Sequence, residues 1–335
     1  MRLDAAVAFD TDLADMPELA RAAERIGFGA IWTAETSHDP FLPIALGAEH
    51  TNRLRFGTAV AIAFARSPTV VAHTAWDLAR LSGGRFILGL GTQVRPHVER
   101  RFGMPWSGRP VAQLREYVGA LRAVWRSWQD GEPLSFRGEH YRLTLMTPFF
   151  APAPIQNPAI PIHLAGVGAP LARLAGEVAD GFAVHPLHSP SYLDEVIRPA
   201  VAAGAAAAGR ETASVALSGS LIVALDDGEI AAARRQVAFY ASTPSYRRVL
   251  AHHGWESVGL ELSELARHAR WEEMGSRITD DMLDAFAIVG SWEDLAGRLR
   301  DRYAERLDRV ALYRSFVPGV EDDRWTGLVA RLAGG

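Results

Sequence analysis

The sequence predicts an α/β fold, a (β/α)8 TIM barrel with insertions, and three observations lead to it. Short apolar runs alternate with amphipathic segments of helical period, which is the pattern of parallel βαβ units. The run at 54–62 is apolar almost throughout, as in strands that are covered on both faces. Eight such runs fit into 335 residues, a length that barrels with insertions reach as one domain. Because no linker or topological switch point is evident, a closed barrel is favoured over an open sheet.

The expected strands follow from the apolar runs and the turn residues that bound them. In chain order they are 3–9, 30–33, 54–62, 86–90, 160–165, 181–184, 215–224 and 309–313. The expected helices are 15–26, 43–50, 69–81, 111–128, 171–179, 192–208, 229–240 and 292–303.

Capping residues set several of these boundaries. The helix at 15–26 carries apolar residues on one face and ends at Gly27. Ser67-Pro68 opens the helix at 69–81, because proline is favoured in the first turn, and Gly83-Gly84 follows its end. Segments 98–110, 130–158 and 242–285 interrupt the alternation and are interpreted as insertions in one domain that spans residues 1–335.

Composition excludes several classes of protein. The chain has 35 basic and 39 acidic residues and a net charge of −4, so no nucleic-acid footprint is expected. It has no cysteine, which excludes thiolate chemistry and fits a reducing cytoplasm. No apolar run reaches the roughly 18 residues of a membrane helix, and aspartates interrupt any signal-peptide core near the N-terminus. No set of His, Asp and Glu has the spacing of metal ligands, so no metal is expected.

Functional residues of such a barrel are expected at the C-terminal ends of its strands. Polar residues follow several of the expected strands, among them Glu35, His38, Thr92, His97 and His185. These positions form the shortlist for the active site.

The long segment from Ser67 to Thr92, with the run Ser82-Gly83-Gly84-Arg85-Phe86-Ile87-Leu88-Gly89-Leu90-Gly91-Thr92, resembles the hallmark of the luciferase-like monooxygenase superfamily. Further segments match in order, namely Arg115-Glu116-Tyr117, Phe136-Arg137-Gly138-Glu139-His140-Tyr141, Pro161-Ile162-His163-Leu164-Ala165-Gly166 and Val289-Gly290-Ser291-Trp292. Together they cover nearly the whole chain. The most similar branch uses coenzyme F420, a deazaflavin, whereas other members use FMN.

The resemblance implies a non-proline cis peptide between Ala59 and Val60. In the family, the bulge that this peptide forms supports the central ring of the cofactor, so Ala59, Val60 and Ala61 are expected at the cofactor. The residues alone are also compatible with an ordinary buried strand.

Gly166-Val167-Gly168 is the candidate for phosphate binding. Small residues before a helix expose backbone N–H groups, and the N-terminus of a helix attracts anions. The resemblance adds His185 to this group. A plain β–α turn remains the alternative.

The resemblance also places Thr92 and His97 in contact with the cofactor. Two departures from the sugar-phosphate dehydrogenases of the family stand out. Val94 replaces an acidic catalytic residue and Thr36 replaces a catalytic histidine, which argues against a sugar-phosphate substrate. Arg95 is expected in the substrate pocket, where it could bind an acidic group.

Glu35 matches an acidic residue that contacts the edge of the deazaflavin in relatives. His38 is the candidate catalytic acid, because imidazole titrates near working pH. The alternative is that Asp39 caps the next helix and His38 faces water. Trp32, Phe64 and Trp106 are expected as apolar walls of the substrate pocket.

The leading hypothesis is hydride transfer between coenzyme F420 and an organic substrate whose identity the sequence does not reveal. One alternative is an FMN-dependent monooxygenase that receives reduced flavin from a partner reductase. A second is a non-catalytic flavin-binding relative. The expected partners are a small-molecule substrate and a second copy of the chain in a homodimer, with no nucleic acid and no membrane.

Overall fold

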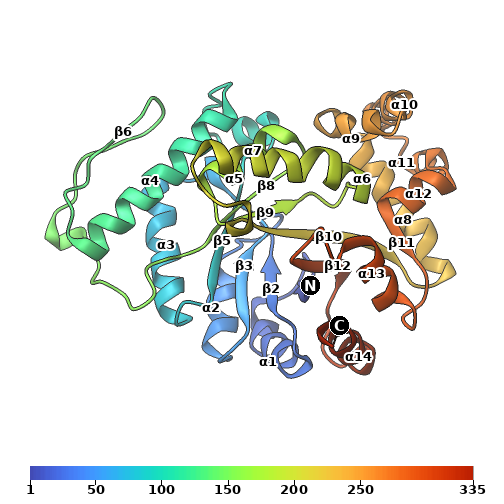
Figure 1. Ribbon diagram of the computed structural model, residues 1–335, viewed down its shortest axis with the longest axis horizontal. Coiled ribbons are helices and arrows are strands. Elements are labelled where there is room, and N and C mark those ends of the chain that lie inside the picture. Colours follow the sequence, from blue (N-terminus) through green and yellow to red (C-terminus); the bar gives the residue numbers. More distant parts are fainter. Residues whose placement is uncertain (335) are drawn as a thin grey trace.

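Parallel strands in the computed structural model, which describes residues 1–334, close into a barrel of eight (Figure 1). The order around the barrel is β1 (Arg2–Ala6), β2 (Ala30–Thr33), β3 (Arg55–Thr58), β5 (Phe86–Gly91), β8 (Ile162–Gly166), β9 (Gly181–Val184), β10 (Ala216–Ala224) and β12 (Arg309–Ser315). The ring closes because β12 pairs with both β1 and β10. The closed barrel predicted from the alternation of strands and helices is thereby confirmed.

Three strands differ from the prediction. The first ends at Ala6 and does not reach residue 9. The run at 54–62 is divided into β3 and β4 (Ala61–Ile62), with a cis peptide between Ala59 and Val60 at the break. The resemblance implied this cis peptide. A further parallel strand, β11 (Ala287–Val289), pairs with the end of β10; three apolar residues that directly follow a helix gave no separate strand signal.

Helices surround the barrel, as Figure 1 shows. Those that alternate with the strands are α1 (Met16–Ile26), α2 (Leu42–Glu49), α3 (Pro68–Leu81), α4 (Pro110–Asp130), α5 (Ala169–Val178), α7 (Arg198–Ala207), α8 (Asp227–Ala241), α13 (Leu295–Tyr303) and α14 (Asp322–Ala333). Their boundaries follow the caps. Gly27 ends α1 with φ +97°, and Ser67 Oγ accepts a hydrogen bond from Val70 N at the start of α3.

The remaining elements fall mainly in the three expected insertions. The first holds a π-helical turn (His97–Arg101), and the second holds the hairpin of β6 (Phe136–Arg137) and β7 (Arg142–Leu143). The third holds α9 (Arg247–His252), α10 (Glu256–Arg267), α11 (Trp271–Met274) and α12 (Asp280–Phe286). The helix expected at 192–208 is α7 preceded by a short α6 (Pro190–Tyr192) and a π-helical turn (Leu193–Ile197).

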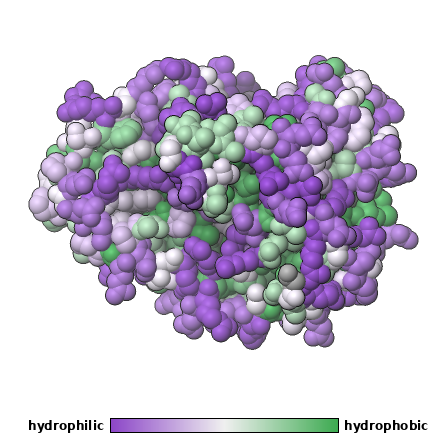
Figure 2. All heavy atoms as spheres, in the orientation of Figure 1, coloured by the Kyte–Doolittle hydropathy of each residue, from purple (hydrophilic) through white to green (hydrophobic). Residues whose placement is uncertain are grey.

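The apolar core lies between the strands and the helices. Trp76, Tyr117, Phe56 and Phe182 are among its largest fully buried side chains. The outer surface is mainly hydrophilic in the face of Figure 2, with apolar side chains between the charged ones. Among the helices of residues 1–334, none is both long enough and apolar enough to span a bilayer.

Candidate active site

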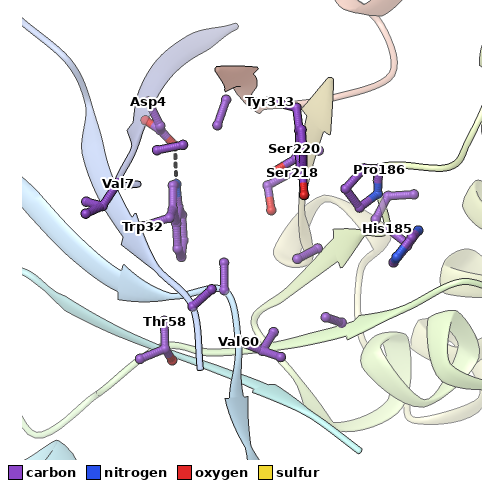
Figure 3. A pocket seen from close by; sticks show the side chains of 18 of the residues that line it. Asp4, Val7, Trp32, Thr58, Val60, His185, Pro186, Ser218, Ser220 and Tyr313 are labelled. Atoms are coloured by element: carbon purple, nitrogen blue, oxygen red, sulfur yellow. Dashed lines mark hydrogen bonds between the residues drawn. The ribbon is translucent and has the colours of Figure 1, made fainter. Parts of the chain in front are cut away.

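A cavity of about 410 Å³ opens at the C-terminal ends of the barrel strands and continues into the barrel (Figure 3). Barrel interiors are usually filled by layers of bulky branched side chains. Here many of the strand residues that line the cavity wall are small, among them Ala6, Ala165, Ala183, Ser218, Ser220 and Ala311. The volume that these side chains leave unfilled forms the cavity.

Polar side chains lie at the deep end of the cavity. Asp4 is buried and accepts hydrogen bonds from Arg309 Nε at 2.8 Å and Arg309 Nη2 at 2.6 Å. Trp32 Nε1 donates to the same carboxylate at 2.8 Å (Figure 3). Burial raises the pKa of Asp4, while Arg309 and Trp32 act in the opposite direction. His163 also lines this region, and burial lowers its pKa to about 4, so its imidazole is neutral at pH 7.

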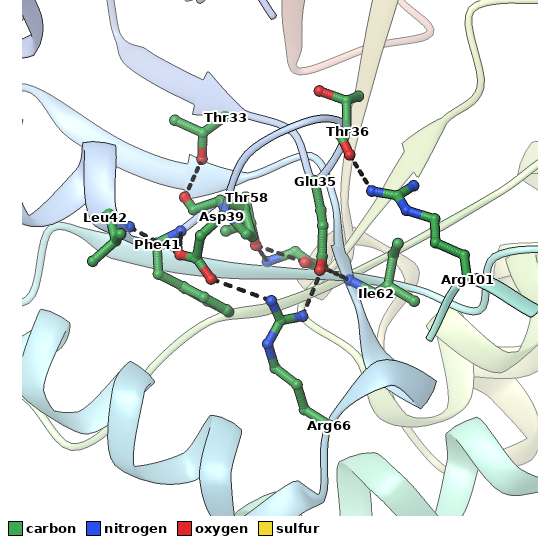
Figure 4. Close-up of polar contacts among 12 residues, drawn as sticks. Thr33, Glu35, Thr36, Asp39, Phe41, Leu42, Thr58, Ile62, Arg66 and Arg101 are labelled. Carbon is green, nitrogen blue, oxygen red and sulfur yellow. Dashed lines mark hydrogen bonds and ion pairs between the residues drawn. The ribbon is translucent and has the colours of Figure 1, made fainter. Parts of the chain in front are cut away.

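Glu35 makes hydrogen bonds at two points along the bulge at Ala59–Val60, and Figure 4 shows its carboxylate with Ile62 and Arg66. Its backbone N–H donates to Val60 O at 3.1 Å, and its carboxylate accepts from Ile62 N at 2.7 Å. Arg66 Nη1 donates to the same carboxylate oxygen at 2.7 Å, and Arg66 Nη2 contacts Asp39 at 3.2 Å. Glu35 also lines the cavity. Its negative charge is neutralised by the guanidinium of Arg66.

Two glycines of β5 make room for the bulge. A Cβ at Gly89 would lie 1.7 Å from the carbonyl oxygen of Thr58, and a Cβ at Gly91 would lie 2.6 Å from Val60 Cγ2. Any side chain at either position would displace the backbone or the side chain of the bulge. The Gly89-Leu90-Gly91 run is thus a packing requirement of the cavity wall.

The Gly166–Gly168 turn connects the cavity to the N-terminus of α5. Gly166 lines the cavity, and Gly168 is the residue before the first turn of the helix. A Cβ at Gly168 would come within 2.4 Å of Arg248 Nη1. Arg248 belongs to α9, inside the third insertion, where the sequence carried no signal for it. A cation from a distant segment therefore lies beside the predicted phosphate-binding turn.

His185, Tyr240 and Tyr313 form an aromatic group on the cavity wall. The His185 ring lies 4.6 Å from the Tyr240 ring, centroid to centroid, and its Nδ1 accepts from Leu187 N at 3.1 Å. Burial lowers the pKa of His185 to about 3, so the ring is neutral and carries its proton on Nε2. Tyr240 Oη donates to Tyr313 Oη at 2.7 Å.

Residues 2–309 match the model of the luciferase-like monooxygenase family. The chain belongs to this family. Protein Rv1360 of Mycobacterium tuberculosis is 49% identical over 316 residues, which cover 92% of each chain. The 5,10-methylenetetrahydromethanopterin reductase of Methanolobus tindarius is 28% identical over 296 residues, which cover 84% of each chain. The structure of a coenzyme F420-dependent tetrahydromethanopterin reductase from Methanopyrus kandleri superimposes with a TM-score of 0.79 at 19% identity, covering 99% of this chain and 98% of that one.

In this luciferase-like protein the cavity brings together only some of the predicted site residues. Those that line it are Trp32, Glu35, Ala59, Val60, Gly166 and His185. The others lie outside its lining, namely His38, Ala61, Phe64, Thr92, Arg95, His97, Trp106, Val167 and Gly168.

The reasons for these outlying positions differ. His38 and His97 are exposed, and Arg95 is exposed and pairs with Glu99 at 3.0 Å. Ala61 and Phe64 are buried, and Phe64 packs edge-on against Trp106 at 6.0 Å between ring centroids. Neighbouring residues in a strand point to opposite sides, so proximity in sequence to the bulge does not place a side chain in the cavity.

Sequence reasoning did not single out several residues that line the cavity: Asp4, Ser218, Ser220, Tyr240, Arg309 and Tyr313. Five of them, Asp4, Ser218, Ser220, Arg309 and Tyr313, lie in strands, whereas the expected site residues were sought mainly beyond strand ends. Asp4 and Arg309 each stand as a charged residue in an expected strand that is otherwise mainly apolar. This was the sequence signal that could have located the deep end of the cavity.

Proposed function

We propose that this luciferase-like protein transfers a hydride between coenzyme F420 and an organic substrate. The observation that carries the proposal is that one cavity contains both the Ala59–Val60 bulge and the rim at Gly166 and His185. A redox ring and the attached phosphate need these two features at one opening. The F420-dependent glucose-6-phosphate dehydrogenase of Nakamurella multipartita, which is 29% identical over 304 residues, supports the choice of cofactor.

The residues present fit such a cofactor. Ala59 and Val60 would support one face of the planar ring, because small side chains there leave backbone accessible from the cavity. The N-terminus of α5 and the guanidinium of Arg248 would hold the phosphate, since backbone N–H groups and arginine both bind phosphate oxygens. Gly168 fits this role because it leaves the space that Arg248 occupies.

A bound reduced deazaflavin supplies the hydride. The protein contributes position and exclusion of water: Glu35 and Arg66 fix the bulge, and the small and aromatic side chains enclose the cavity. His185 and Tyr313 are among the lining side chains that offer polar hydrogens to the cavity. His38 is exposed and lies outside the lining of the cavity. The role of catalytic acid requires that the loop at 35–39 moves when the cofactor or the substrate binds.

Calorimetric titration with F420 and with FMN tests the proposal. We expect F420 to bind more tightly than FMN. The Arg248→Ala variant should weaken F420 binding by about tenfold, because a charge-assisted hydrogen bond to phosphate is lost. It should leave the binding of a deazaflavin without the phosphate unchanged. Arg21→Ala, an exposed arginine on α1, is the matched control. Tight binding of FMN without binding of F420 would refute the proposal.

The second candidate is an FMN-dependent monooxygenase served by a partner reductase, which the family's description as monooxygenases favours. It predicts FMN binding and consumption of oxygen when reduced FMN is supplied. A third outcome, binding of a cofactor whose redox state no substrate in a broad panel changes, would indicate a non-catalytic relative.

A further inference from the structure

Every carboxylate and guanidinium that lines the cavity already has a counter-ion within the protein. Asp4 pairs with Arg309 at 2.6 Å, and Glu35 pairs with Arg66 at 2.7 Å. Arg314, at the rim, pairs with Glu229 and with Glu321, the latter at 2.7 Å. The histidines of the lining, His163 and His185, have depressed pKa values because they are buried. Among residues 1–334, the side chains that line the cavity therefore offer no unpaired charge to a ligand.

The wall opposite the bulge carries hydroxyl groups. Strand β10 lies four strands away from β3 in either direction around the barrel, so Ser218 and Ser220 face Val60 across the cavity. Tyr313, on the neighbouring strand β12, points its hydroxyl into the same space (Figure 3). Because Tyr240 donates to Tyr313, the Tyr313 hydrogen remains available for another acceptor.

We propose that the substrate is a neutral, largely apolar molecule with a carbonyl-type oxygen, and that Tyr313, with Ser220 beside it, binds that oxygen. This inference rests on the proposed function, because it places the substrate oxygen on the wall that faces the cofactor's support at Val60. Tyr240 acts as a positioning residue, since its hydrogen bond orients the hydroxyl of Tyr313.

Desolvation gives the physical reason for the selectivity. A carboxylate or ammonium group that enters this cavity loses its hydration and meets only charges that are already neutralised. A carbonyl oxygen loses less hydration and gains a hydrogen bond from a hydroxyl that is already in place. The small and aromatic lining contacts the apolar part of the molecule.

Three matched probes test the selectivity: acetophenone, benzoate and benzylammonium. Their binding to the full chain is measured by calorimetry, with and without saturating oxidised F420. We expect acetophenone to bind at least about tenfold more tightly than either charged probe. Tyr313→Phe should weaken acetophenone binding by about three- to tenfold. Tyr141→Phe removes a tyrosine hydroxyl that bonds Gln113 in a different part of the fold and is the matched control.

A second experiment tests the inference by a gain of benzoate binding. Glu229→Gln combined with Glu321→Gln removes both counter-ions of Arg314 while preserving the size of the side chains. This double variant should bind benzoate at least about tenfold more tightly than the parent protein, because an unpaired guanidinium then faces the cavity. Circular dichroism of the variant confirms that it folds.

The outcomes separate this inference from the proposed function. Equal affinity for benzoate and acetophenone, no binding of any probe, or an unchanged Tyr313→Phe variant would overturn the inference, even if F420 binds. A preference for acetophenone that depends on Tyr313, without any binding of F420, would support the substrate class and refute the proposed cofactor.

Discussion

Glu35 shows how one side chain serves two purposes at the residue scale. Its carboxylate satisfies the backbone of the bulge at Ile62 and neutralises Arg66, and only 5% of the side chain is exposed. Sequence reasoning assigned it to the cofactor's edge. The structure adds that it fixes the backbone on which a ring would rest.

Replacing Glu35 by glutamine should therefore cost stability and cofactor affinity together. The variant keeps an acceptor for Ile62 N but leaves Arg66 with only the weaker pair to Asp39. We expect the free energy of unfolding in urea to fall by about 2 kcal/mol, less than for a fully buried pair because Arg66 is partly exposed. Glu18 belongs to an exposed ion pair, so Glu18→Gln should leave the free energy of unfolding unchanged. Equal destabilisation by both variants would contradict this account.

At the scale of elements, one carboxylate accepts three backbone hydrogen bonds from the hairpin of the second insertion. Glu116 of α4 accepts hydrogen bonds from the backbone N–H groups of Glu139 at 3.0 Å, His140 at 2.7 Å and Tyr141 at 3.2 Å. Desolvation by itself would raise the pKa of Glu116. The three N–H donors have the larger combined effect, so the pKa is lowered. The Glu116 and Glu139-His140-Tyr141 segments of the family resemblance are thus in contact.

Glu116→Ala should release the β6–β7 hairpin without unfolding the barrel. Three backbone N–H groups lose their acceptor, so amide hydrogen exchange across residues 136–143 should accelerate by about tenfold or more. Mass spectrometry measures this by segment. Glu132→Ala, whose partner Arg126 lies 3.7 Å away, is the control and should leave exchange in the hairpin unchanged. Exchange that accelerates throughout the barrel would contradict local anchoring.

At the scale of the molecule, the Asp4–Arg309 pair links the first and last strands of the barrel across 305 positions of sequence. Arg309→Met should lower the free energy of unfolding by about 3–5 kcal/mol, because Asp4 is left buried without a partner. Asp4→Leu combined with Arg309→Met should recover most of that loss. A double variant as unstable as the sum of the single variants would show that the two residues are not coupled.

Acid stability is a second property of the whole molecule. Burial depresses the pKa values of His163, His185 and His188 to about 4, 3 and 4, respectively. Well above pH 6.5, the ordinary histidine pKa, these residues are neutral in both the folded and the unfolded state. As the pH falls from about 6.5 toward 4, the unfolded chain takes up their protons first, so stability is lost.

The free energy of unfolding should fall by up to about 4 kcal/mol per pH unit when all three histidines contribute. Urea unfolding between pH 4 and 7 measures it. His163→Gln should flatten the slope, whereas His38→Gln, at an exposed position, should not change it. A slope that is the same with and without His163 would mean that this residue titrates normally in the fold.

The sequence by itself determined the order of strands and helices, the caps at Gly27 and Ser67, and through the family resemblance the cis peptide at Ala59–Val60. Local periodicity and turn chemistry are sufficient for the order of the elements and for the caps, because these depend on residues that are near one another in the chain. The cis peptide was implied only by the resemblance.

Only the tertiary structure decided which side chains share the cavity. Strands of a parallel barrel are covered on both faces, so their apolar runs do not reveal which residues point inward. Closure of the ring brings Asp4 to Arg309, the packing of α8 brings Tyr240 to Tyr313, and the placement of the third insertion brings Arg248 to Gly168. These contacts depend on strand register and on the placement of an insertion, which the local sequence does not encode.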